Sequence, residues 1–260
     1  MTEMFGYSVK DTVITVPEFA TAHERNALLD AADLAGLTVL ALMDENTAAA
    51  LQHAISQTYT EDANVLFYNM GANSLQVSII TFGPKMVTFG AKKDEINVGK
   101  VVVRGKAWDS ALGGWWFDHK LTEMLAQGFN AKWGKGDVRE FLRPMAKLQA
   151  QTTKVKKVLS TNTEIPVTLQ SLHDDIDFTT TVTRAAFEEA SKDLLTRVTD
   201  PIDQALAQAG MTLADIQAVE VIGGGSRIPK VQEKLVEYFS TGVDMPLALG
   251  AHLNGDEAPW

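Results

Sequence analysis

The amino-acid sequence predicts an α/β fold in which two α/β blocks flank an insert built from helices and a β-hairpin. Strand and helix patterns alternate near the N-terminus, and a run of antiparallel strands follows them. A buried strand, a glycine turn and a helix then close the chain. The blocks are expected at residues 1–125 and 185–260, with the insert at residues 126–184.

The first block begins with two strands that are separated by a helix. Residues 11–17 are short and rich in β-branched side chains, which is typical of a buried strand. Thr21 and Glu24 form a capping-box pattern at the start of a helix. Residues 38–43 predict a second strand, and residues 47–55 predict an alanine-rich helix. Strands joined through helices at this spacing are expected to be parallel.

An antiparallel meander of three or four strands follows in the same block. Residues 64–70 and 75–82 predict a hairpin because apolar residues fill the first strand and alternate in the second. Turns are expected at residues 83–85 and near residues 92–94, so that the pattern continues through further strands.

Helices and a second strand pair fill the rest of the chain. Pro144 is expected in the first turn, or at a kink, of a long helix, and Pro201 is expected to divide a later helical region. The predicted helices are residues 116–129, 138–159, 185–210 and 228–239, and the predicted strands are residues 164–172, 178–184 and 218–223.

The composition excludes several classes of function. The chain has 23 basic and 33 acidic residues, a net charge of −10 and no cysteine. Such a chain is a poor electrostatic partner for nucleic acid, and it has no disulfides, thiolate zinc sites or cysteine nucleophiles. No apolar stretch approaches the roughly 18 residues of a membrane span, and the first residues lack signal-peptide features. The histidines have no partners at metal spacing, so no metal site is expected.

Charge is distributed unevenly along the chain. Basic side chains dominate residues 132–157, and acidic side chains dominate residues 171–220. Two interpretations stay open. The stretches are solvated helical faces of opposite sign, or the basic stretch is an anion site for which phosphate is the obvious ligand.

Two turns place small residues directly after buried strands. The hairpin turn (residues 71–74) joins two strands, and the triple-glycine turn (residues 223–227) joins a strand to a helix. Glycine lets a backbone approach a ligand, and a following helix start favours an anion. By itself the triple-glycine turn is more typical of a tight turn without a ligand, and it is neither a Walker loop nor a dinucleotide fingerprint. The helix that carries Lys156, Lys157 and Ser160 would complete one cleft with both turns.

Eight motifs occur in order along residues 7–258: VITVP, AGLTVLALMDENTAAAL, NMGANSLQVSI, LGGWWFD, KVKKVLS, DIDF with TVTRAAFEE, IGGGSRIPKVQ and NGDEA. This order resembles the nucleotide-binding domain of the seventy-kilodalton heat-shock chaperones. The resemblance implies an actin-like ATPase fold, of which the chain holds the second lobe and a small part of the first. FYNMG and DENTA are similar to the large hundred-and-ten and one-hundred-and-seventy-kilodalton relatives.

The resemblance implies that the hairpin turn binds the β- and γ-phosphates of ATP or ADP through backbone N–H groups. Gly71 and Ser74 match the family pattern. Ala72 and Asn73 replace glycines, which predicts a less close approach of the phosphates.

The remaining nucleotide contacts follow from the same resemblance. Lys156, Lys157 and Ser160 match a helix that holds adenine and ribose, whereas Thr153 stands where the family has an acid for the ribose hydroxyls. Asp256 matches a residue near the sugar. The triple-glycine turn matches the segment around the α-phosphate and adenine through Gly223, Gly224, Gly225, Arg227 and Ile228, with Arg227 placed to stack on the base.

The catalytic positions depart from the family. Asn69 and Gln76 replace aspartates that organise magnesium-bound water, and Trp115 and Trp116 replace an acidic pair. Glu45 is kept at a position linked to water positioning. An amide cannot take a proton or balance the charge of Mg²⁺, so Glu45 and Asn69 match family positions without predicting a hydrolytic site.

The resemblance therefore implies a nucleotide-binding fragment of a divergent chaperone. The intact protein would bind ATP or ADP with Mg²⁺ and act as a chaperone or a nucleotide-exchange partner. Two alternatives stay open, a catalytically competent ATPase engine of a foldase and an interaction scaffold without nucleotide. The expected partners are a conventional seventy-kilodalton heat-shock chaperone and unfolded polypeptides, in the endoplasmic reticulum lumen or, alternatively, the cytoplasm. The first phosphate hairpin and the catalytic lysine lie before Tyr7 in the family, so the fragment is expected to be inactive alone.

Overall fold

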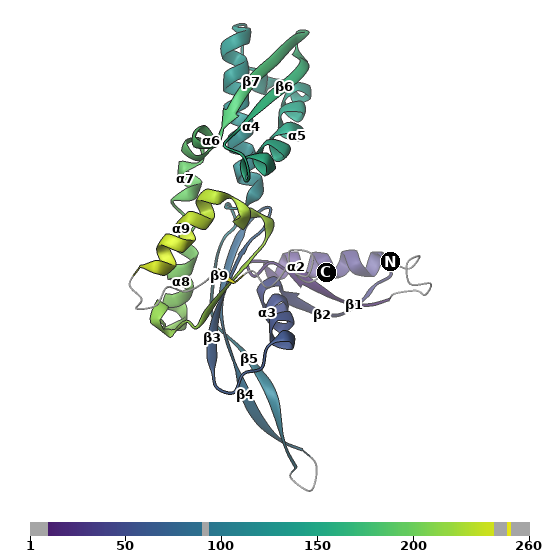
Figure 1. The fold of residues 1–260 in the computed structure, drawn as a ribbon. Helices are drawn as coiled ribbons and strands as arrows, with labels where there is room; N and C mark the ends of the chain where they lie inside the picture. The colour runs from purple at the N-terminus through teal and green to yellow at the C-terminus, as the bar shows by residue number, and fades with distance from the viewer. Residues whose placement is uncertain (1–9, 90–93, 242–248, 251–260) are drawn as a thin grey trace.

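The computed structural model describes residues 10–89, 94–241 and 249–250, and three sheets organise this part of the chain (Figure 1). The largest is a five-stranded mixed sheet in the order β5-β4-β3-β8-β9. One two-stranded sheet precedes it in sequence, and the other lies between β5 and β8. The strands of the mixed sheet are β3 (Ala63–Met70), β4 (Leu75–Phe89), β5 (Asp94–Asp109), β8 (Ala218–Ile222) and β9 (Leu249–Gly250).

The first two-stranded sheet confirms the alternation predicted near the N-terminus. Strands β1 (Asp11–Val16) and β2 (Thr38–Asp44) are parallel, and α2 (Ala22–Leu34) connects them. The predicted capping box is present, since Thr21 and Glu24 exchange side-chain and backbone hydrogen bonds at the start of α2. Helix α3 (Glu45–Ser56) begins two residues earlier than expected because it follows directly on β2.

Helices cover both faces of the mixed sheet. Alternate side chains of β3 point to opposite sides, as the two-residue period of a strand requires. Leu66 and Tyr68 join a large core with α8 (Asp200–Ala209) and α9 (Pro229–Ser240), whereas Phe67 joins a smaller core with α3. Burial on both faces explains why β3 is an almost continuous apolar run.

The turn predicted at residues 83–85 is wrong. Strand β4 continues through these residues to Phe89, and Pro84 pairs with Gly99 of β5. The reason lies in the sheet edge. Strand β3 ends its pairing with β4 at Ala63, opposite Phe82, so beyond that point the described β4 has β5 alone as its neighbour. Proline is tolerated on such an edge because no ladder hydrogen bond is lost there. The second predicted turn lies largely outside the described residues, and β5 begins at Asp94.

The insert is a pair of helices packed on a β-hairpin at one end of the mixed sheet (Figure 1). Helices α4 (Gly114–Trp133) and α5 (Leu142–Leu159) pack together, and β6 (Glu164–His173) pairs antiparallel with β7 (Ile176–Thr183). Their buried side chains belong to the same large core as the sheet. Helix α4 runs unbroken past residue 126, so the division of the chain into blocks and insert stays a prediction.

Two predicted helices are divided in the structure. The helix expected at residues 138–159 separates at Phe141 into the short η1 (Val138–Glu140) and α5, with Pro144 in the first turn of α5. The region 185–210 forms α6 (Arg184–Ala190), α7 (Lys192–Leu195) and α8. Pro201 was expected to divide this region, and it lies in the first turn of α8. Proline suits a first turn because the N–H that it lacks would have no partner there.

Candidate functional site

The hairpin turn and the triple-glycine turn meet at one edge of the mixed sheet. They follow β3 and β8, which are parallel neighbours. Gly223 has a φ of +86°, and a Cβ at this position would collide with the carbonyl oxygen of Met70. A Cβ on Gly225 would lie 2.9 Å from the carbonyl oxygen of Gly71. Glycine is therefore required at both positions, because the two backbones are in direct contact.

Three consecutive carbonyl groups of the hairpin turn accept hydrogen bonds from the start of α4. The Gly114 amide donates to the Gly71 carbonyl at 3.0 Å, and the Trp115 amide donates to the Ala72 carbonyl at 2.7 Å. The Trp116 indole N–H donates to the Asn73 carbonyl at 3.0 Å. Gly113 allows this approach, since a Cβ there would lie 2.6 Å from the Ala72 carbonyl oxygen. These bonds hold the turn against α4.

The same bonds orient the N–H groups of the turn. All described peptide bonds are trans, and in a trans peptide the N–H points opposite to the carbonyl of the preceding residue. The N–H groups of Ala72 and Asn73 therefore point away from α4, on an exposed part of the chain. Ala72 and Asn73 both lack a positive φ. Residues other than glycine can therefore adopt this geometry. Adjacent N–H groups with one direction form an anion-binding concavity.

Helix α5 reaches the same place through Lys156. Its Nζ donates to the Gly114 carbonyl at 2.6 Å and to Asp118 Oδ2 at 2.8 Å. The side chains of Lys156 and Asp118 are 15% and 11% exposed. Thr153 also donates to Asp118 Oδ2, at 3.3 Å. Sequence reasoning missed Asp118, because nothing in its local motif marks it as a partner of a lysine 38 residues away.

The other predicted nucleotide residues lie in different environments. Lys157 and Arg227 are exposed, and Gly224 is exposed with open space around it. Ser160 caps the end of α5, where its hydroxyl donates to the Lys156 carbonyl at 3.2 Å. Ile228 is 4% exposed and belongs to the large core. Asp256 lies outside the described residues.

The two amides at the catalytic positions are held in a polar network beside the turns. Asn69 donates to Asn46 Oδ1 at 3.0 Å. Gln76 donates to Glu45 Oε2 at 2.7 Å and accepts from the backbone N–H of Glu18 at 2.9 Å. Both amides therefore serve as links between β3 or β4 and the first part of the chain.

Glu18 is the least expected member of this network. It is 5% exposed, its Oε1 accepts from Ser78 at 2.5 Å, and its buried Oε2 has no hydrogen-bond partner in the described chain. Burial raises the pKa of Glu18 from its ordinary 4.5 to about 7, although Ser78 and the charge of Lys106 oppose the shift. A single acid after a strand carried no signal of this environment in the sequence.

Comparison with known proteins identifies the family. The model of the Hsp70 protein family matches residues 1–258. The chain belongs to the Hsp70 family. It is 38% identical to heat shock 70 kDa protein 17 of Arabidopsis thaliana over 252 residues, which are 96% of the chain and 28% of that protein. It is 40% identical to hypoxia up-regulated protein 1 of Homo sapiens over 257 residues, which are 96% of the chain and 25% of that protein.

Membership confirms the predicted family, its resemblance to the large stress-protein branch and the actin-like ATPase fold. Hypoxia up-regulated protein 1 of Danio rerio, at 39% identity over 254 residues, adds a third relative. The chain spans about a quarter of the length of these relatives. The activity of the whole protein and the nucleotide chemistry of this chain are separate questions from family membership.

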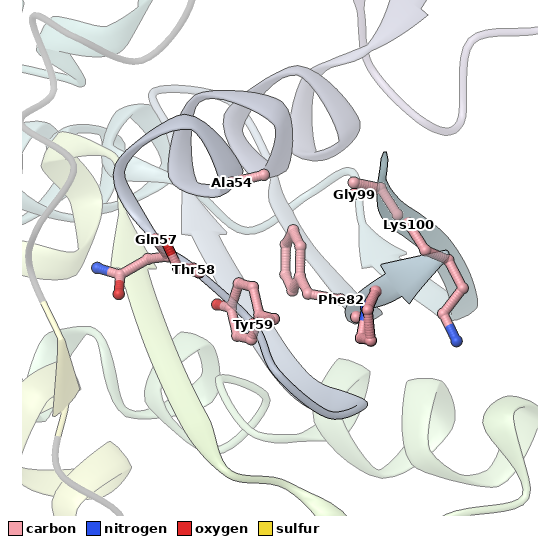
Figure 2. Close-up of a pocket in the computed structure, with 10 residues that line it drawn as sticks. Ala54, Gln57, Thr58, Tyr59, Phe82, Gly99 and Lys100 are labelled. Atoms are coloured by element: carbon pink, nitrogen blue, oxygen red, sulfur yellow. The ribbon is translucent and has the colours of Figure 1, made fainter. Parts of the chain in front are cut away.

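A pocket of about 300 Å³ lies away from both turns of this Hsp70 chain (Figure 2). Its walls come from the end of α3 and from the β4–β5 ribbon. Tyr59 and Phe82 stack with ring centroids 5.1 Å apart, and Lys100 at the rim pairs with Asp62 at 2.6 Å. It shares no lining residue with either turn.

Within residues 10–89, 94–241 and 249–250, no group of three or more histidine, aspartate or glutamate side chains is suited to a metal ion. No helix in these ranges combines the length and the apolar character needed to cross a membrane.

Substitution of the glycines in the triple-glycine turn tests the backbone contact. Gly223→Ala and Gly225→Ala are each expected to lower the free energy of unfolding by about 2–4 kcal/mol, because a Cβ meets the backbone of β3. Gly224→Ala is the matched control, since its Cβ meets no atom within 4 Å. Chemical denaturation measures all three. Equal losses for Gly224→Ala and Gly225→Ala would contradict the contact.

The burial of Glu18 predicts a pH-dependent stability. The unfolded chain releases the Glu18 proton near pH 4.5, whereas the folded chain keeps it to about pH 7. The stabilising contribution is complete below pH 4.5 and is lost as the pH rises to 7, by about 3 kcal/mol. In denaturation series across this window, Glu18→Gln should lack this loss, and Glu189→Gln, at an exposed carboxylate, should keep it. Parallel curves for wild type and Glu18→Gln would refute the assignment.

Proposed function

We propose that this chain forms the second-lobe part of an adenine-nucleotide site in a divergent Hsp70 chaperone, where it binds ATP or ADP and supports protein folding as a chaperone or as a nucleotide-exchange partner. Family membership supports the chaperone role. The nucleotide site itself is inferred from the arrangement of the two turns and α5.

The observation that carries the proposal is the outward direction of the Ala72 and Asn73 N–H groups. Two adjacent N–H groups with one direction suit a phosphate oxygen, with no side-chain charge needed to hold it. The exposed Gly224 and Arg227 lie on the neighbouring turn, where a base can stack on a guanidinium. Backbone groups held this firmly lose little entropy on binding, which favours affinity.

The polar network favours binding over hydrolysis. A bound nucleotide brings Mg²⁺ through its phosphates, and this ion prefers carboxylate, phosphate and water oxygens. At the two family positions the chain offers Asn69 and Gln76, and both amides are already hydrogen-bonded to Asn46 and Glu45. These residues do not fit a charge-balancing magnesium site, so no hydrolytic step is assigned to them.

Arg227→Ala tests the nucleotide site in the full-length protein. Removing the guanidinium is expected to weaken ADP binding about tenfold while leaving the fold intact, since the side chain is exposed. Isothermal titration calorimetry measures the affinity. Arg143→Ala is the control. It removes an exposed arginine of α5, and the variant should bind ADP like wild type. A wild-type protein that binds no adenine nucleotide would instead support the scaffold alternative.

Single-turnover hydrolysis of ATP separates the binding role from the ATPase alternative. The full-length protein is expected to hydrolyse ATP about a hundredfold or more slowly than a conventional Hsp70, because amides replace the acids. Asn69→Asp should raise the rate about tenfold, although it also removes the donor to Asn46. Asn26→Asp makes the same change on the exposed face of α2 and should leave the rate unaltered. Wild-type hydrolysis at conventional rates would favour the ATPase engine.

Compartment and partners are part of this proposal. The match to hypoxia up-regulated protein 1 supports the endoplasmic reticulum lumen, with the cytoplasm as the alternative. A conventional Hsp70 and unfolded polypeptides are the proposed partners. They would be bound by the whole protein, of which this chain corresponds to about a quarter in its relatives.

A further inference from the structure

Asp118 of α4 and Lys156 of α5 form a nearly buried ion pair. Their side chains are 11% and 15% exposed, and Nζ lies 2.8 Å from Oδ2. Asp118 Oδ1 is buried and has no hydrogen-bond partner in the described chain. Lys156 therefore provides the balancing charge for a carboxylate with little access to solvent, and removal of either partner alone leaves a nearly buried charge uncompensated.

The ion pair also connects α5 to the hairpin turn. Besides Asp118, Lys156 contacts the carbonyl of Gly114. The amide of Gly114 in turn donates to Gly71 in the hairpin turn. One short path of hydrogen bonds therefore runs from α5, through the first turn of α4, to the backbone that presents the outward N–H groups.

The pair changes what Lys156 can contribute to a ligand. Two of its three N–H donors are used within the protein, and its charge is matched by Asp118. Thr153 donates to the same carboxylate oxygen. Asp118 of α4 thus accepts hydrogen bonds from two side chains of α5, Lys156 and Thr153.

We propose that Asp118 is a positioning residue for nucleotide binding, which holds Lys156 so that α5 and the hairpin turn contact one nucleotide as a single rigid unit. This inference rests on the proposed nucleotide site. It assigns Asp118 no contact with the ligand. Its effect on affinity passes through Lys156, and this separates it from a general structural role.

Amide hydrogen exchange of the nucleotide-free, full-length protein tests whether Asp118 stabilises the contact between α4 and the hairpin turn. Asp118→Asn keeps the shape of the side chain and removes its charge. Exchange of the Gly114 and Trp115 amides, which donate to the hairpin turn, should become about tenfold faster. Lys154→Met removes an exposed lysine of the same helix and should leave these amides unchanged. Unaltered exchange in Asp118→Asn would overturn the proposal, whether or not the protein binds nucleotide.

A double-mutant cycle in ADP affinity tests whether Asp118 affects nucleotide binding through Lys156. Asp118→Asn alone is expected to weaken ADP binding about tenfold, and in a Lys156→Met background it should weaken it less than about twofold. Equal effects in the two backgrounds would overturn the proposal, since Asp118 would then act independently of Lys156. If Asp118→Asn does not fold, Asp118→Leu combined with Lys156→Met removes both charges and supplies the comparison with Lys156→Met alone. Absence of ADP binding in the wild-type protein would count against the proposed function. The exchange experiment would still decide whether Asp118 stabilises the contact between α4 and the hairpin turn.

Discussion

Direct contact between backbones at the C-terminal edge of β3 is the constraint on which the candidate site depends. The hairpin turn is enclosed by the start of α4 on one side and by the triple-glycine turn on the other. Side-chain atoms have no room at Gly113, Gly223 and Gly225. Because the turn's carbonyl groups are used on the α4 side, the N–H groups of Ala72 and Asn73 point away from α4. The anion-binding surface proposed here would thus result from packing, without a cationic side chain in the turn.

A second constraint is the polar network that joins the first part of the chain to the mixed sheet. Glu18, Asn46, Gln76 and Ser78 are each at most 5% exposed, and hydrogen bonds connect them, with Glu18 Oε2 left without a partner in the described chain. Amides suit such an interior because they need no compensating charge. The same property makes them poor substitutes for catalytic acids, so in the proposed site the chemistry that stabilises this junction would also limit hydrolysis.

The insert is attached by both apolar and polar contacts. Its buried side chains continue the core of the mixed sheet, and the Asp118–Lys156 pair adds a directional link to the site. Five of the eight basic residues of the stretch are exposed, and Arg139 pairs with Glu123 and Asp137. The solvated-face interpretation therefore describes most of that stretch. Lys156 is paired with Asp118, so the exposed Lys157 is what the anion-site interpretation retains near the turns.

The sequence by itself determined the features that depend on near neighbours. Alternation of apolar residues, the capping box at Thr21 and the helix start at Pro201 each specify their local structure, and ordered motifs specified the family. Tertiary structure decided what depends on residues far apart in the chain. Pro84 remains in a strand because of where β3 ends, and Glu18 and Asp118 acquire their roles only from the side chains that folding brings to them. Side chains that are buried by, or paired with, residues tens of positions away leave no periodic pattern in the sequence. No local motif therefore predicts them.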